Sequence, residues 1–236
     1  MNVLLTCAGR RILPVRAFQW AVKGRGKVFT CDSDPQAPAM TKADRAFVVP
    51  SIDNPEYIDH LLALCRENGV RLLVPALEPE LTLLAENRRR FLDAGTFPLV
   101  SSPAVVEACG DKLATAAFLK TLGIDSPRSV TSLDGARRAV AAGELAYPLV
   151  VKPRWGVSSF GFEVCEDDEE LELCYRLVRR RLQQSLIAKV SATDAGRSVL
   201  IQEHLSGTEY GFDVVNDLHG EYVCTFLRRK VRMRSG

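Results

Sequence analysis

The stretch from Tyr147 to Val164, YPLVVKPRWGVSSFGFEV, places two cations and several small residues between two apolar segments. LVV and FEV have the composition of buried strands, but the loop between them exceeds the about two to five residues that a hairpin needs. Glycine lets a backbone approach a ligand closely, and successive N–H groups of such a loop can converge on phosphate oxygens. We therefore predict that this loop covers phosphate, with Lys152 reaching it from the end of the first strand.

Four small residues of the loop carry this prediction, and they are Gly156, Ser158, Ser159 and Gly161. The loop is not a Walker A sequence, because the pattern GxxxxGK[ST] is absent. Taken alone, the loop fits a solvent-exposed flexible segment equally well.

A second cationic pattern lies in FLRRKVRMRSG, where Arg228, Lys230, Arg232 and Arg234 occupy every second position. On a strand these four side chains would share one face, roughly 6.6 Å apart. Because like charges on one face repel each other, we expect an anion there. A solvated sheet edge and a nucleic-acid-binding surface are the alternatives. The second is disfavoured, because no aromatic residues alternate with the cations.

The segment LIQEHLSGTEYGFDVV (200–215) is a third candidate. Gln202, Glu203 and Glu209 bracket a Ser-Gly turn. The backbone between them could hydrogen-bond an adenine edge, and the carboxylate beyond the turn could hold ribose hydroxyls. A polar strand–turn–strand without a ligand is the plainer interpretation.

These candidates need elements to position them, and the first hundred residues alternate strand-like and helix-like patterns. Such alternation predicts a parallel sheet with helices on both faces. The expected strands are 2–7, 27–31, 46–50, 71–75 and 97–100, and the expected helices are 11–23, 55–68 and 78–92. Ligands bind such sheets at the carboxyl ends of the strands. Glu78 and Glu80 follow a strand and could bind an amine there, although acids favoured at a helix N-terminus are the better interpretation.

After residue 101 the pattern changes to helices followed by runs of strands, which predicts an α+β unit. We expect two short helices broken near Gly110, then helices at 132–142 and 167–184, and a flexible loop at 191–198. The chain is therefore predicted to have two domains, 1–105 and 106–236.

The overall composition is that of an ordinary globular protein, with 236 residues, 47% hydrophobic and 25% charged. The net charge of +2 gives no strong field for nucleic acid, and no apolar run approaches the ~20 residues of a membrane helix. Seven cysteines without CxxC predict reduced thiols, and the three histidines lack metal-ligand spacing. We expect a cytoplasmic protein without metal ligands among these residues, without a membrane partner and without nucleic acid.

Four segments, taken in order, resemble the ATP-grasp superfamily, and most of all its carbamoyl-phosphate-synthetase-like carboxylate–amine ligases. The segments are DKLATAAFLKTLGIDSPRS (111–129), YPLVVKPRWGVSSFG (147–161), IQEHLSGTEYGFDVV (201–215) and RRKVRMRSG (228–236). The resemblance implies an α/β protein with a Rossmann-like pre-ATP-grasp domain followed by an incomplete α+β ATP-grasp domain.

The resemblance also implies roles for individual residues. Lys112 and Lys152 would contact the phosphates of ATP, under a mobile flap formed by residues 156–161. Gln202, Glu203 and Leu205 would lie along adenine, largely through backbone atoms, and Glu209 would hold the ribose. The residues expected to face the γ-phosphate or an acyl-phosphate are Lys230 and, as catalytic groups, Arg232 and Arg234.

The activity implied is an ATP- and Mg²⁺-dependent ligation of a small-molecule carboxylate to an amine or thiol through an acyl-phosphate. Members of this family place their Mg²⁺ ligands further along the chain, so we expect those ligands beyond Gly236 and interpret the chain as a fragment, inactive by itself. Two alternatives remain open at this stage, a non-catalytic nucleotide-binding or assembly module and a nucleic-acid binder. The formation of a homo-oligomer is left open.

Overall fold

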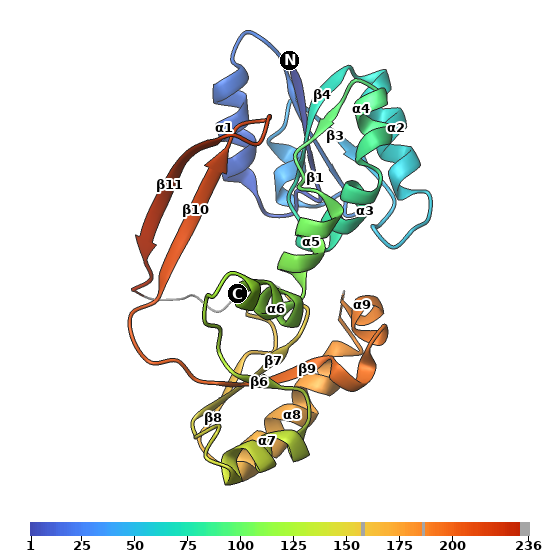
Figure 1. Ribbon diagram of the computed structural model, residues 1–236. Helices are drawn as coiled ribbons and strands as arrows, with labels where there is room; N and C mark the ends of the chain where they lie inside the picture. The colour runs from blue at the N-terminus through green and yellow to red at the C-terminus, as the bar shows by residue number, and fades with distance from the viewer. Residues whose placement is uncertain (157–158, 186, 232–236) are drawn as a thin grey trace. The chain divides into compact units, whose positions relative to one another are not determined.

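The computed structural model describes residues 1–156, 159–185 and 187–231, and Figure 1 traces the chain through them. The chain divides into two compact units, Met1–Glu107 and Ala108–Gly236. Among the described residues, the first unit contains one sheet and the second contains two.

The first unit is built on a five-stranded parallel sheet in the order β3-β2-β1-β4-β5. Its strands are β1 Asn2–Thr6, β2 Val28–Asp32, β3 Arg45–Val48, β4 Val70–Pro75 and β5 Phe97–Pro98. Its helices are α1 Ile12–Val22, α2 Tyr57–Glu67, α3 Leu81–Glu86 and α4 Arg88–Asp93, with 3-10 turns η1 Pro38–Thr41 and η2 Glu78–Glu80. The strand order reverses between β1 and β4. Open α/β sheets bind ligands at such a reversal point, at the carboxyl ends of the strands.

Helices cover both faces of this sheet, as the all-apolar strands predicted. Successive residues of β1 point to opposite faces, so Val3 and Leu5 pack with Val15 of α1. Leu4 points the other way and packs with Leu61 of α2. Figure 1 shows α1 and α2 on opposite sides of the sheet.

The single helix predicted over 78–92 is wrong, because the structure divides this segment into η2, α3 and α4. The break lies at Asn87, whose side-chain amide donates to the carbonyl of Leu83 at 2.9 Å. A short polar side chain that bonds its own backbone competes with the helical hydrogen bonds, and this ends α3.

The second unit holds a four-stranded antiparallel sheet in the order β6-β9-β7-β8. Its strands are β6 Ser129–Val130, β7 Leu149–Pro153, β8 Glu163–Cys165 and β9 Val199–Glu203. Its helices are α6 Lys112–Thr121, α7 Leu133–Ala141, α8 Asp168–Leu182 and α9 Ala188–Ala192, with the 3-10 turn η3 Ala195–Arg197, while α5 Pro103–Gly110 spans the division between the units. The hairpin expected around the glycine-rich loop is β7–β8.

Residues 191–198 are partly helical, so the prediction of a loop there is wrong in part. The end of α9 covers Ser191 and Ala192, and η3 covers 195–197. The turn is closed locally, because the Arg197 amide donates to the Asp194 carbonyl at 2.9 Å.

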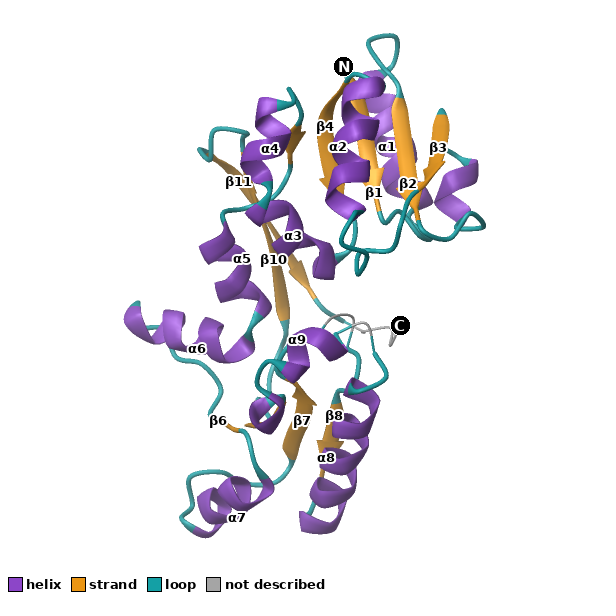
Figure 2. Cartoon of the chain, turned by 90° about the vertical axis from the view of Figure 1, so that its right-hand side faces the viewer, coloured by secondary structure: helices purple, strands orange, loops and turns teal. Residues whose placement is uncertain are grey.

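One face of the second sheet packs on α7 and α8, and Figure 2 shows α8 alongside β7 and β8. The strand residues in this core are Leu149, Val151, Cys165, Val199 and Ile201. Because side chains alternate along a strand, the residues between them face the other way. Lys152 of β7 and Gln202 of β9 therefore lie on the opposite face.

A separate two-stranded sheet pairs β10 Tyr210–Asn216 with β11 Tyr222–Arg229. Its large apolar side chains are exposed, with Phe212 at 65% and Leu227 at 60% of full exposure. The prediction of one strand carrying four alternate cations is wrong, because β11 ends at Arg229 and Lys230 lies beyond it. Arg232 and Arg234 lie outside the described residues.

Among the helices that the structure describes, none is long and apolar enough to cross a lipid bilayer.

Candidate functional site

Lys152 stands at the end of β7, just before the glycine-rich loop, and its ammonium group donates to the side-chain oxygen of Gln202. The amide nitrogen of Gln202 in turn donates to the Ser129 hydroxyl at 2.7 Å. The three side chains come from neighbouring strands β7, β9 and β6, so the sheet itself aligns them. The Ser129 contact orients the amide of Gln202 with its oxygen toward the lysine.

In the part of the chain that the structure describes, no carboxylate is paired with the Lys152 ammonium group. Burial lowers the pKa of its amine below the ordinary value, and within the described residues no carboxylate offsets that effect. A partly buried ammonium group held only by an uncharged amide is disfavoured relative to one in water. An anion beside it would remove that penalty, so this position can bind a phosphate or carboxylate group.

Both ends of the loop after Lys152 pass close to the ring of Pro153, and this close approach favours glycine at each end. A Cβ on Gly156 would lie 3.2 Å from Cβ of Pro153, and a Cβ on Gly161 would lie 3.2 Å from Cγ of the same proline. Gly161 also has a φ of +65°, which side chains rarely tolerate. Ser159 has a φ of +59°, whereas Ser158 lies outside the described residues.

Lys112 is brought to the start of this loop. It is the first residue of α6, whose N-cap is Asp111, and the Asp111 carboxylate accepts from the Leu113 amide at 2.9 Å. The ammonium group of Lys112 donates to the carbonyls of Arg154 at 3.2 Å and Gly156 at 3.5 Å. Two of the cations expected to contact phosphate therefore flank the first residues of the loop from different elements.

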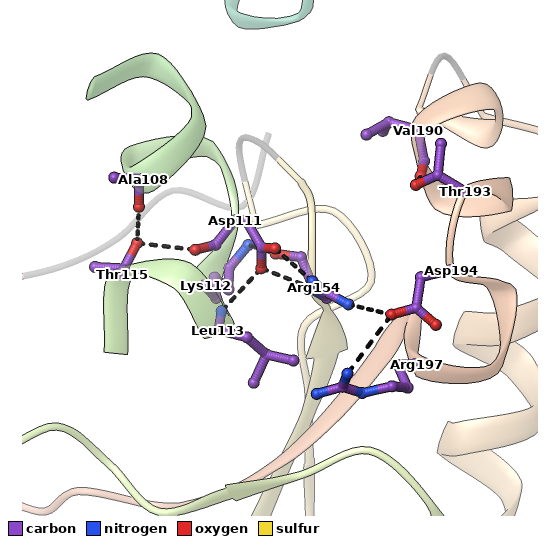
Figure 3. Close-up of polar contacts among 10 residues, drawn as sticks. All are labelled: Ala108, Asp111, Lys112, Leu113, Thr115, Arg154, Val190, Thr193, Asp194 and Arg197. Carbon is purple, nitrogen blue, oxygen red and sulfur yellow. Dashed lines mark hydrogen bonds and ion pairs between the residues drawn. The ribbon is translucent and has the colours of Figure 1, made fainter. Parts of the chain in front are cut away.

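Arg154, which the sequence did not single out, is the centre of a charge network, and Figure 3 shows its guanidinium group between two carboxylates. It donates to Asp111 at 2.8 and 2.6 Å and to Asp194 at 2.7 Å. It also lies 4.2 Å from the centre of the Trp155 ring. Burial acts to raise the pKa of Asp111, but the hydrogen bonds and the charge of Arg154, together with the backbone amides at the start of α6, lower that pKa overall.

The side chains of Gln202 and Glu203 are engaged inside the second unit. Gln202 contacts Lys152, and a carboxylate oxygen of Glu203 accepts from the Arg128 amide at 2.7 Å. Leu205 follows β9 and is exposed. Adenine binding along this segment stays a prediction.

Glu209 and Lys230 are brought together by the β10–β11 hairpin, although one was expected at ribose and the other at phosphate. Their side chains form an ion pair, and the Lys230 amide donates to the Glu209 carbonyl at 2.8 Å. Arg228 likewise pairs with Asp213. These two described cations are offset by one acid in β10 and by another directly before it, so their mutual repulsion does not by itself require a bound anion.

Glu80 in the first unit is fully buried, unlike an acid placed at a helix terminus for the dipole. Its carboxylate accepts from the hydroxyls of Tyr57 at 2.5 Å and Thr6 at 2.9 Å. Burial raises its pKa to about 6, against the lowering effect of these hydrogen bonds. Glu80 therefore ties the end of β1 to α2 at the reversal point of the sheet.

Among the described residues, no three His, Cys, Asp or Glu side chains are grouped as ligands of a metal ion.

Two family models match the chain, one in each unit. Residues 3–99 match the PylC-like N-terminal domain, and residues 145–235 match the ATP-grasp domain. The resemblance to the ATP-grasp superfamily is thereby confirmed for residues 145–235 of the chain. The matched segment contains Lys152, the glycine-rich loop and the Gln202 segment.

Curated proteins similar to this chain are longer than it. The biotin carboxylase of Halalkalibacterium halodurans is 28% identical over 152 residues, covering 61% of this chain and 33% of that protein. The carbamoyl phosphate synthase large chain of Methanoculleus marisnigri is 29% identical over 164 residues, covering 64% of this chain and 15% of that protein. The chain thus spans a third or less of the length of these two curated relatives.

The fold agrees with solved ATP-grasp structures. The N5-carboxyaminoimidazole synthetase of Staphylococcus aureus, solved with ADP, has a TM-score of 0.67 and 16% identity. The similarity covers 97% of this chain and 54% of that one. At this identity the likeness concerns the fold alone.

Proposed function

We propose that this chain binds ATP through its second unit and that the whole protein is an ATP-dependent carboxylate–amine ligase. The observation that carries the proposal is the partly buried Lys152, whose described partner is the uncharged Gln202 amide. The glycine-rich loop begins directly after the lysine, and Lys112 reaches its first residues. An ATP phosphate would supply the negative charge that this arrangement lacks.

The other predicted contacts are with the phosphates, the adenine and the ribose of ATP. The loop from Gly156 to Gly161 would donate backbone hydrogen bonds to phosphate and exclude water when closed. The backbone around Glu203 and Leu205 would receive the adenine. Glu209 would bind ribose hydroxyls, which requires it to leave the ion pair with Lys230.

Relatives support the ligase class. The similar proteins include a biotin carboxylase, a carbamoyl phosphate synthase and a D-alanine–D-alanine ligase of Thermotoga petrophila, the last 34% identical over 126 residues. A carboxylate oxygen would attack the γ-phosphorus of ATP and release ADP. The amine nitrogen would then attack the acyl carbon, lose a proton and expel inorganic phosphate. Catalysis of this kind depends on positioning and charge stabilisation.

Lys230, Arg232 and Arg234 are proposed to face the transferred phosphoryl group. The described residues do not group acidic side chains as Mg²⁺ ligands, so they do not fit that metal by themselves.

The test is a calorimetric titration of the full chain with ATP. We expect Lys152→Ala to weaken ATP binding by about ten- to a hundredfold or more, because a charge-assisted hydrogen bond is worth about 1.5–3 kcal/mol. Lys120→Ala is the matched control, since Lys120 is an exposed lysine of α6 in the same unit. Equal affinity of the Lys152→Ala variant and wild type would refute the site. ATP binding without ADP release from any acid–amine pair, tested in the whole protein, would instead identify a non-catalytic nucleotide-binding module.

A further inference from the structure

Arg154 joins three segments of the second unit that are distant in sequence. Its guanidinium group contacts Asp111 and Asp194, which are 43 and 40 residues away along the chain. Its own backbone amide donates to the Ser198 carbonyl at 2.9 Å. With 14% of its side chain exposed, Arg154 lies largely inside this junction.

The positive charge of Arg154 is offset by carboxylates within the junction. Two carboxylates receive its three hydrogen bonds, and Arg197 lies 3.9 Å from the second of them. Two acids and two arginines therefore balance each other (Figure 3). A guanidinium group held in this way differs from Lys152, whose positive charge has no carboxylate partner among the described residues.

Arg154 also contacts the start of α6, where Lys112 lies. The carbonyl of residue 154 accepts from the backbone amide of Lys112 at 3.3 Å and from its ammonium group at 3.2 Å. At the same time, the side chain of Arg154 binds the carboxylate of Asp111, the residue before the lysine. Side chain and backbone of one residue thus attach the start of α6 to the base of the glycine-rich loop.

We propose that Arg154 is a positioning residue for ATP, which acts through Lys112 and does not itself contact phosphate. Its contacts with Asp111 and Asp194 keep the Lys112 ammonium group at the start of the loop. Residue 154 itself lies two residues after Lys152 on the same chain segment. The carbonyls that accept from Lys112 belong to residues 154 and 156, directly after Lys152 on the chain, so the two lysines flank the start of the glycine-rich loop. This role rests on the proposed function.

A double-mutant cycle with ATP as the ligand tests this role in the full chain. Arg154→Lys retains the positive charge but loses the planar fork that binds two carboxylates. If Arg154 acts through Lys112, Arg154→Lys weakens ATP binding about tenfold in the wild-type chain and less than about twofold in a Lys112→Ala background. NMR titration measures the millimolar affinities of the weaker variants. Arg181→Lys, which alters an exposed pair with Glu163, is the control expected to bind ATP like wild type.

An equal loss of ATP affinity in both backgrounds would overturn the positioning role, because it would show that Arg154 acts independently of Lys112. If Arg154→Lys does not fold, as judged by circular dichroism, Asp194→Asn takes its place, since Asp194 is 36% exposed and supplies one of the bonds. We then expect about threefold weaker binding that disappears in the Lys112→Ala background. Tighter binding would show that the freed guanidinium group binds phosphate directly, which contradicts the proposal. A wild-type chain that binds no ATP would overturn the proposed function and this inference together, whereas a binding wild type with an additive cycle overturns only the inference.

Discussion

Replacing Glu80 with glutamine is expected to change how the stability of the first unit depends on pH. Burial raises the pKa of Glu80 from 4.5 to about 6, while hydrogen bonds from Tyr57 and Thr6 act in the opposite direction. Between these two values the folded protein holds the proton more tightly than the unfolded chain does. The contribution of Glu80 is therefore full below about pH 4.5 and is lost as the pH rises through about 6. At about 1.36 kcal/mol for each tenfold change in proton affinity, the loss amounts to ~2 kcal/mol.

The assay is amide hydrogen exchange of β1 and β4 in the full chain, because these buried strands report the opening free energy of the first unit. Measurements from about pH 4 to 8 should show the difference between wild type and Glu80→Gln changing by ~2 kcal/mol. Glu78→Gln is the matched control and should follow wild type, since Glu78 is exposed. A difference between wild type and Glu80→Gln that does not vary with pH would refute the buried-carboxyl explanation.

Two further predictions concern the second unit. Gly161→Ala should destabilise it in urea by about 1–3 kcal/mol more than Gly143→Ala, because the new Cβ at 161 would crowd Pro153, whereas Gly143 has a similar φ of +70° and open space around it; equal costs would contradict this. ATP binding at an alkaline pH below the ordinary lysine pKa of 10.5 should take up protons, since phosphate raises the lowered pKa of Lys152 toward that value. Calorimetry in two buffers of different ionisation enthalpy would show this uptake in wild type but not in Lys152→Met, and a buffer-independent wild-type heat would count against it.

Most elements of the fold could be predicted from local patterns. The parallel sheet of the first unit follows from short apolar runs that alternate with helical spacing, and all five expected strands are present within a few residues. The β7–β8 hairpin follows from two apolar runs on either side of a loop. These predictions succeed because a strand or helix repeats over neighbouring residues, so its period can be read in a short window.

Predictions failed where a local pattern met a competing side chain. The helix expected over 78–92 breaks at Asn87, whose amide bonds the backbone of its own helix. The alternate cations after Thr225 were expected to need an anion, but Asp213 and Glu209 of the neighbouring strand segment offset Arg228 and Lys230. Neither acid could be matched to its cation before the strand register was known.

Some features of the candidate site could be predicted from the sequence, and others depend on the tertiary structure. Residue types and local order were enough to point to Lys152, the glycines of the loop and the lysine at the start of α6. The contacts that set their chemistry join distant positions, since Lys152 meets Gln202 from 50 residues away and Gln202 meets Ser129 from 73. Arg154 looked like one more loop cation until the folded chain placed it between Asp111 and Asp194. Charge and burial depend on which residues become neighbours in space, and only the tertiary structure decides that.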